Sequence, residues 1–166
     1  MFWNIFVVIN QRVTVMYSIL LTAHSIIRWL VLLSLIFAIY RSWHSYYYKS
    51  IFTRKDDAIR HWTATIAHVQ LMLGIILYSQ SSMVKYYFST GGLSSGEPFF
   101  FGVIHILLML IAIVVITLGS AKAKRKIIDT EKFRTMLIWY SIALVIILIA
   151  IPWPFSPLSH RPLLRF

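Results

Sequence analysis

Residues 99–120 read FFFGVIHILLMLIAIVVITLGS, and no Asp, Glu, Lys or Arg interrupts them. About 20 apolar residues, each adding ~1.5 Å of helix rise, cross a hydrocarbon core ~30 Å thick. The stretch therefore predicts a transmembrane helix. Three other stretches of suitable length and apolar character lie at about 17–40, 58–80 and 136–153. The sequence thus predicts four membrane spans, and their short connections favour an all-α, up-down four-helix bundle.

The composition of the 166-residue chain excludes an ordinary soluble domain. Hydrophobic residues make up 59% of the chain and charged residues 13%, whereas soluble domains carry roughly 25% charged residues. The mean hydropathy is +0.76. The chain has no cysteine, so disulfides, iron–sulfur clusters, thiolate metal sites and covalently attached c-type haem are excluded.

The charges between the predicted spans indicate how the bundle is oriented. Basic residues concentrate in the connections 41–57 and 121–134, whereas the connection 81–98 holds only Lys85 and Glu97. Because Lys and Arg beside membrane spans are retained on the cytoplasmic side, we expect the two basic connections to be cytoplasmic. The connection 81–98 and both termini are then external, on the periplasmic side of a bacterial inner (plasma) membrane.

The net charge of +11 is explained by the same two connections. Basic residues beside spans attract anionic headgroups, so we expect membrane lipids as partners and no nucleic acid. The predicted spans divide the chain into three regions. Residues 1–15 form a non-spanning tail because polar residues interrupt their apolar run, residues 16–156 form the bundle, and residues 157–166 form an external C-terminal tail.

Four ionisable residues lie within the predicted spans: His24, Arg28, His68 and His105. No Asp or Glu lies there, so the carboxylate relay of proton-driven transporters is missing and no catalytic residue is predicted. Counted at ~1.5 Å per residue, His24 and His105 lie ~9 Å below the outer border and His68 roughly 16–18 Å below it. Ionisable groups are costly at such depths and indicate a functional site.

Histidines that project from facing helices are the ligands that a b-type haem requires. We expect His24 and His105 to be the axial pair that holds the haem iron, with His68 as a substitute or supporting group. Arg28, one turn below His24, is a partner for a haem propionate or a substrate anion. Gly102, one turn before His105, is expected to leave room for the flat face of the macrocycle.

Other interpretations of these residues stay open. Three interhelical hydrogen-bonding histidines also stabilise a bundle without any cofactor. Met72 and Met109, four residues beyond His68 and His105, are either core residues or thioether ligands, and imidazole with thioether suits copper. A non-catalytic structural or accessory subunit of a larger membrane complex is also consistent with the pattern.

Four segments resemble a group of small bacterial four-helix membrane proteins labelled cytochrome b-like. They are YSILLTAHSIIRWLVLL (17–33), IAHVQLMLGIILY (66–78), IHILLMLIAIVVITLGSAKAKRK (104–126) and LIAIPWP (148–154). The resemblance implies a haem b cytochrome or cytochrome-like electron-transfer subunit, with a redox partner or other membrane-complex subunits. In that group an acidic residue and a proline flank the third-span histidine, but Ile104 and Ile106 stand there in this chain.

Overall fold

The computed structural model describes residues 2–156, 159 and 161–162, without the side chains of residues 2–11 and 13. The helices are α1 (Phe2–Tyr47), α2 (Arg54–Gln80), α3 (Ser82–Ser89), α4 (Glu97–Phe99), α5 (His105–Arg125) and α6 (Asp129–Ala150), with a π-helical turn η1 (Phe100–Ile104) between α4 and α5. Four stretches are long and apolar enough to span a membrane: Thr14–Tyr47, Arg54–Gln80, Glu97–Arg125 and Asp129–Ala150. The four predicted spans are confirmed.

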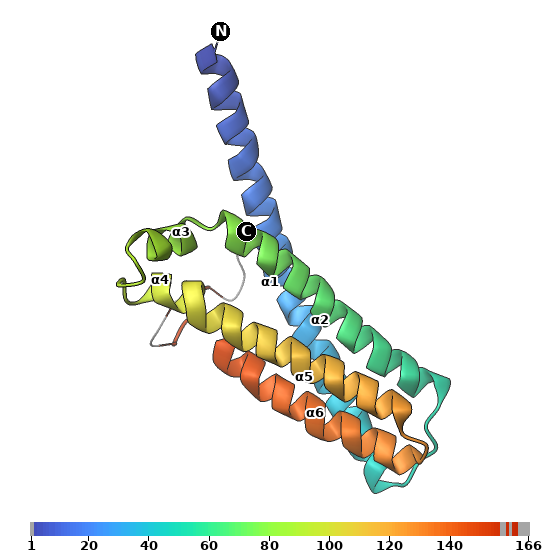
Figure 1. Cartoon of the computed structure of the whole chain (residues 1–166). Helices are drawn as coiled ribbons and strands as arrows, with labels where there is room; N and C mark the ends of the chain where they lie inside the picture. Colours follow the sequence, from blue (N-terminus) through green and yellow to red (C-terminus); the bar gives the residue numbers. More distant parts are fainter. Residues whose placement is uncertain (1, 157–158, 160, 163–166) are drawn as a thin grey trace.

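The four long helices pack as an up-down bundle, as predicted (Figure 1). Each of α1 and α5 packs against both α2 and α6. We call the end that carries the α1–α2 and α5–α6 connections the basic end. The opposite end carries α3, α4 and the described part of the chain after α6, and we call it the α3 end (Figure 1).

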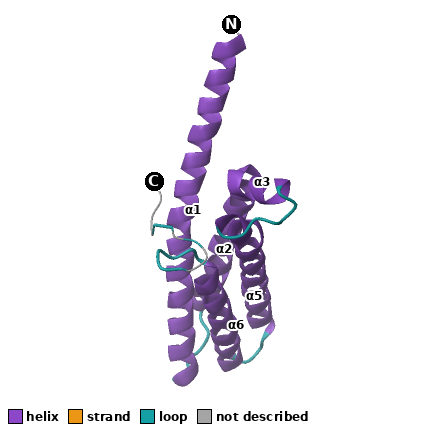
Figure 2. Cartoon of the chain, turned by 90° about the vertical axis from the view of Figure 1, so that its left-hand side faces the viewer, coloured by secondary structure: helices purple, strands orange, loops and turns teal. Residues whose placement is uncertain are grey.

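The first helix is longer than its neighbours and extends past them at its N-terminal end (Figures 1 and 2). Neither Gly nor Pro occurs between residues 2 and 47, so nothing in the sequence interrupts the helical hydrogen bonds. Residues 2–15, which we predict to be a non-spanning tail, are therefore the first turns of α1. That they do not span stays a prediction.

Small residues let the helices approach closely in the middle of the bundle. On α5, Gly119 faces Trp139 of α6 so closely that a Cβ on Gly119 would lie 2.4 Å from the Trp139 Cβ. Close packing of this kind holds membrane helices together where hydrophobic burial does not distinguish protein from lipid. The fully buried side chains of the core cluster include Leu35, Ala38, Ala67, Ala112, Ile116, Ala123, Tyr140 and Ala143.

A polar network closes the basic end. Asp56, only 1% exposed, accepts hydrogen bonds from the Thr53 amide (2.9 Å) and from Arg41 Nε (2.7 Å), and with Thr53 it forms the capping box that begins α2. Arg60 of α2 donates to Ser120 Oγ of α5 at 2.6 Å. Tyr140 of α6 donates to the Arg60 carbonyl at 3.0 Å. All four long helices are thus joined at this end by hydrogen bonds to α2.

Candidate functional site

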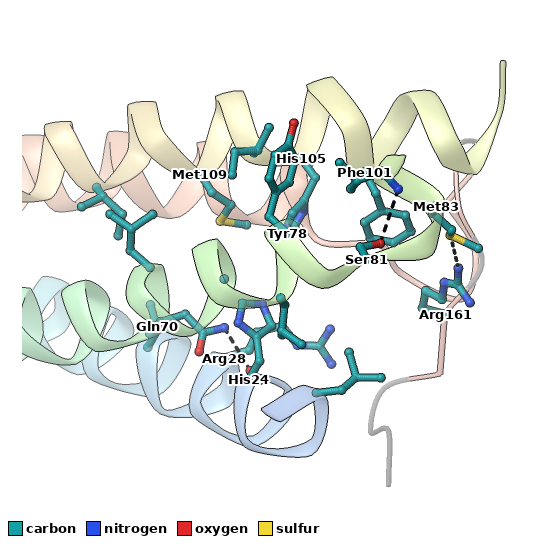
Figure 3. Close-up of a pocket in the computed structure, with 18 of the residues that line it drawn as sticks. His24, Arg28, Gln70, Tyr78, Ser81, Met83, Phe101, His105, Met109 and Arg161 are labelled. Carbon is teal, nitrogen blue, oxygen red and sulfur yellow. Dashed lines mark hydrogen bonds between the residues drawn. The ribbon is translucent and has the colours of Figure 1, made fainter. Parts of the chain in front are cut away.

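A cavity of about 300 Å³ lies between α1, α2 and α5, toward the α3 end (Figure 3). Its lining is mostly apolar, and a few polar side chains interrupt it: His24 and Arg28 of α1, Gln70 and Tyr78 of α2, and His105 of α5. The volume is at the small end of the range for ligand sites, and an apolar lining with few convergent polar groups is typical of such sites.

His105 enters the cavity from the first position of α5, and its ring is held by α6. Its Nδ1 lies 2.8 Å from the Ala150 carbonyl oxygen. Since a carbonyl only accepts, Nδ1 carries the hydrogen. In a neutral imidazole the other nitrogen, Nε2, then keeps its lone pair. Metal-binding histidines commonly have this arrangement.

Two prolines explain why the Ala150 carbonyl is available to His105. In a longer α6 the carbonyls of residues 148 and 150 would accept from the amides of residues 152 and 154, but both are proline and have no N–H. The helix ends at Ala150. From the sequence we predicted that the fourth span ends at Trp153. The Trp153 indole then donates to the Leu148 carbonyl at 2.8 Å, while His105 donates to that of Ala150.

His24 faces the same cavity from α1, and its ring packs on α2 (Figure 3). The contact is close, since a Cβ at position 74 would lie 3.3 Å from His24 Cε1 and the ring would have to shift slightly. The Gln70 amide donates to the His24 backbone carbonyl at 3.0 Å. The Nδ1 of His24 and the Oε1 of Gln70 are buried without a hydrogen-bond partner among the described residues. Such buried groups are uncommon and are often satisfied by a ligand or water.

Arg28 also lines the cavity, with its guanidinium 5.6 Å from the centre of the Trp29 ring. The structure thus brings together three of the four residues predicted from the sequence: His24, Arg28 and His105. Figure 3 shows that they come from facing sides, the first two from α1 and the third from α5.

His68 does not line the cavity. It is exposed, and its Nε2 lies 2.9 Å from Thr117 Oγ1 on α5. The single hydroxyl hydrogen of Thr117 is donated to the Ile113 carbonyl at 2.7 Å, so in the contact with His68 the threonine oxygen accepts and Nε2 donates. This nitrogen is therefore occupied by a structural hydrogen bond between α2 and α5.

The prediction that Gly102 makes room for a macrocycle was wrong. A Cβ at Gly102 would lie 2.8 Å from Tyr87 Cδ1, so the space beside this glycine is filled by a side chain of α3. The Gly102 carbonyl accepts a hydrogen bond from the Tyr78 hydroxyl at 2.8 Å. Of the two methionines, Met109 lines the cavity and Met72 is 65% exposed.

Polar cavity residues that were missed in the sequence include Gln70, Tyr78 and Arg161. Arg161, after α6, lines the cavity and pairs with Glu97 at the start of α4 with an N–O distance of 2.5 Å. The sequence carried a signal for the pair: of the five acidic residues, Glu97 alone lies outside the two basic connections. Within residues 2–156, 159 and 161–162, no group of three or more His, Cys, Asp or Glu side chains is placed to hold a metal ion.

Comparison of the chain with family models, with curated proteins and with solved structures found no match. The fold itself defines the class of the chain, which is a small membrane protein of four transmembrane helices.

Proposed function

We propose that the chain is a membrane cytochrome or cytochrome-like electron-transfer subunit that binds haem b between His24 and His105. One observation carries the proposal: two imidazoles from facing helices line one cavity, and the Nδ1 of His24 has no hydrogen-bond partner among the described residues. The His105 Nδ1 bond to Ala150 leaves its Nε2 as the ligand nitrogen. The resemblance to cytochrome b-like membrane proteins supports the same function.

The two histidines suit haem b better than the volume of the cavity does. Two neutral imidazoles are the usual axial ligands of a low-spin b-type haem. A haem macrocycle occupies more space than about 300 Å³, so binding requires side chains to move. Met109 lines the cavity, and its flexible thioether chain can reorient at little cost.

When bound, haem supplies one-electron transfer. The residues of the chain would hold and orient it: His24 and His105 would bind the iron, and Arg28 would pair with an acidic group of the haem or a substrate anion. His68 has no part in this arrangement because its Nε2 is bonded to Thr117. The apolar lining keeps water away from the ligand.

We place the protein in a bacterial inner membrane, with the basic end cytoplasmic and the α3 end and both termini periplasmic. The asymmetry of charge supports this orientation, since four of the five acidic and most of the basic residues lie at the basic end. The basic residues there meet anionic membrane lipids. The haem site is then in the periplasmic half, within reach of a redox partner on that side.

Purification with haem in excess tests the function. The protein is extracted in mild detergent, its absorption spectrum is recorded and a pyridine haemochrome assay is performed. We expect a Soret band in wild type that is lost in His24→Ala and His105→Ala and is kept in His68→Ala and in the exposed control His61→Ala. A colourless wild-type protein contradicts the proposal, as does a Soret band that survives in both cavity variants.

A second candidate function is that of an accessory subunit of a larger membrane complex, and the length of α1 favours it. Its 46 residues correspond to about 69 Å of helix, which exceeds the ~40–45 Å thickness of a whole bilayer. A helix that passes beyond its own bundle offers a surface to another subunit. Gentle extraction followed by native mass spectrometry separates the two: a stable partner supports this candidate, and a monodisperse monomer contradicts it.

A further inference from the structure

The cavity carries hydroxyl and guanidinium groups at its α3 end and apolar side chains at its far end, with Arg28 and Gln70 between them. Its lining at the α3 end includes Tyr17, Ser81, Ser82 and Arg161, whereas farther along the helices it is formed by Val31, Ala67, Ile113 and Ile147. A molecule that matches this gradient carries its polar groups at one edge and its hydrocarbon at the other. The cavity thus selects an amphiphile inserted apolar edge first.

The charges of the lining give the sign of the polar groups. Two arginines, Arg28 and Arg161, line the cavity, and the described lining contains no Asp or Glu. Glu97 pairs with Arg161 but lies outside the lining. In an apolar environment a cationic lining favours an anionic ligand because water screens little there. The ligand is therefore expected to carry negative charge.

Arg161 is held in a fixed position by several contacts. Its Nη2 lies 2.5 Å from Glu97 Oε2 and 3.2 Å from Met83 Sδ, and its guanidinium lies 5.3 Å from the centre of the Phe101 ring. Ser159, 1% exposed, donates to the other Glu97 oxygen at 3.0 Å. Both ends of the Glu97 carboxylate thus bind the chain after α6 to the start of α4.

One donor of this guanidinium, the Nε of Arg161, is buried and unpaired among the described residues. A buried donor without an acceptor destabilises the folded protein. The Nε–H of a guanidinium that already binds one carboxylate through Nη2 is a charged donor that suits the oxygen of another carboxylate.

We propose that the cavity recognises a carboxylate-bearing amphiphile, and that Arg161, positioned by Glu97, binds its carboxylate at the α3 end. The inference rests on the proposed function where the carboxylates are the two haem propionates. A fatty acid carries the same group on a different apolar body. In either case Arg161 adds a contact that the two histidines do not make.

The test compares haem b with its dimethyl ester, in which both propionates are neutral. Purified haem-free protein in detergent is titrated with each, and binding is followed by the Soret band. We expect wild type to bind haem b at least about tenfold more tightly than the ester, in line with the strength of charge-assisted hydrogen bonds. In Arg161→Gln the preference falls several-fold and the remainder is due to Arg28, while the affinity for the ester is unchanged.

Two further variants complete the experiment. Arg125→Gln removes an exposed guanidinium at the basic end, whose Nε bonds the Ala121 carbonyl at 3.2 Å, and should keep the full preference. Glu97→Gln leaves Arg161 in place but removes its anchoring charge, so the preference should fall by an intermediate factor. An ester bound as tightly as haem b by wild type overturns carboxylate recognition, and so does a full preference in Arg161→Gln.

A third probe separates the failure of this inference from that of the proposed function. The fluorescent fatty acid cis-parinaric acid is titrated into wild type and Arg161→Gln. If wild type binds neither haem form but binds the fatty acid in an Arg161-dependent way, the haem function is wrong and carboxylate recognition stands. If wild type binds none of the three, both are wrong.

Discussion

The Nδ1 of His105 on α5 and the carbonyl oxygen of Ala150, the last residue of α6, are joined by a hydrogen bond of 2.8 Å. The bond satisfies a helix-terminal carbonyl, which has no partner within its own helix, and it fixes the orientation of the imidazole. The end of one helix and the candidate ligand of another are thus determined together.

Replacing both prolines after α6 tests this relationship. In Pro152→Ala/Pro154→Ala the two restored amides can continue the helix and compete with His105 for the Ala150 carbonyl. We expect the affinity for haem to fall several-fold, while helix content by circular dichroism stays constant or rises. Pro162→Ala, at an exposed position, is the control. An unchanged affinity in the double variant would show that the ring is held by packing alone.

Gly74→Ala places a methyl group 3.3 Å from His24 Cε1. Because His24 belongs to the cavity, we expect reduced haem affinity and a shifted Soret band, with little change in bundle stability. Gly119→Ala is the matched contrast, since its methyl group would lie 2.4 Å from Trp139 Cβ. That variant should lose about 1–3 kcal/mol of stability in detergent without a shift of the Soret band. If Gly74→Ala and Gly119→Ala had the same effects on the Soret band and on stability, the assignment of Gly74 to the cavity and of Gly119 to helix packing would be wrong.

Tyr140→Phe removes the hydroxyl that bonds the Arg60 carbonyl at 3.0 Å. The side chain is fully buried, so we expect a loss of about 1 kcal/mol in the free energy of unfolding, measured by urea or SDS titration of the detergent-solubilised protein. Tyr46→Phe, where the side chain is 41% exposed, should have no effect. Equal stability of Tyr140→Phe and wild type would show that this end of the bundle does not depend on the bond.

Because the chain has no cysteine, its orientation can be measured directly with single-cysteine variants. Ser95→Cys at the α3 end and Lys55→Cys at the basic end both occupy exposed positions. In intact spheroplasts we expect a membrane-impermeant maleimide to label the first and to leave the second unlabelled until the membrane is broken. The reverse pattern would place the basic end outside.

The four helices could be predicted from the sequence because apolar length is a local property of each span. That His24 and His105 lie at a similar level of the bundle could also be predicted, since rise per residue is constant along a helix, and both line the cavity. The rotation of α2 about its own axis could not be predicted. His68 and Gln70 are two residues apart, hence roughly 200° apart around the helix, and it is Gln70 that faces the cavity. Depth alone does not distinguish them.

The contacts of the α3 end could not be predicted for a different reason. Arg161 and Glu97 lie 64 residues apart, and nothing local to either residue indicates the pairing. Gly102 was assigned to the wrong partner because small residues indicate a close neighbour without identifying it. Here the neighbour is Tyr87 on α3, a short helix that lies outside the four predicted spans.

The π-helical turn Phe100–Ile104 is geometrically equivalent to one extra residue in a regular helix, and one residue corresponds to about 100° of rotation. It therefore turns Glu97 relative to α5 without moving His105. Deleting Val103 should restore a regular helix, rotate Glu97 away from Arg161 and leave the His105 contact to Ala150 intact. The two parts of the site are thus altered by different kinds of mutation. The Glu97–Arg161 pair at the α3 end is altered by insertions and deletions, and the histidines are altered by substitutions.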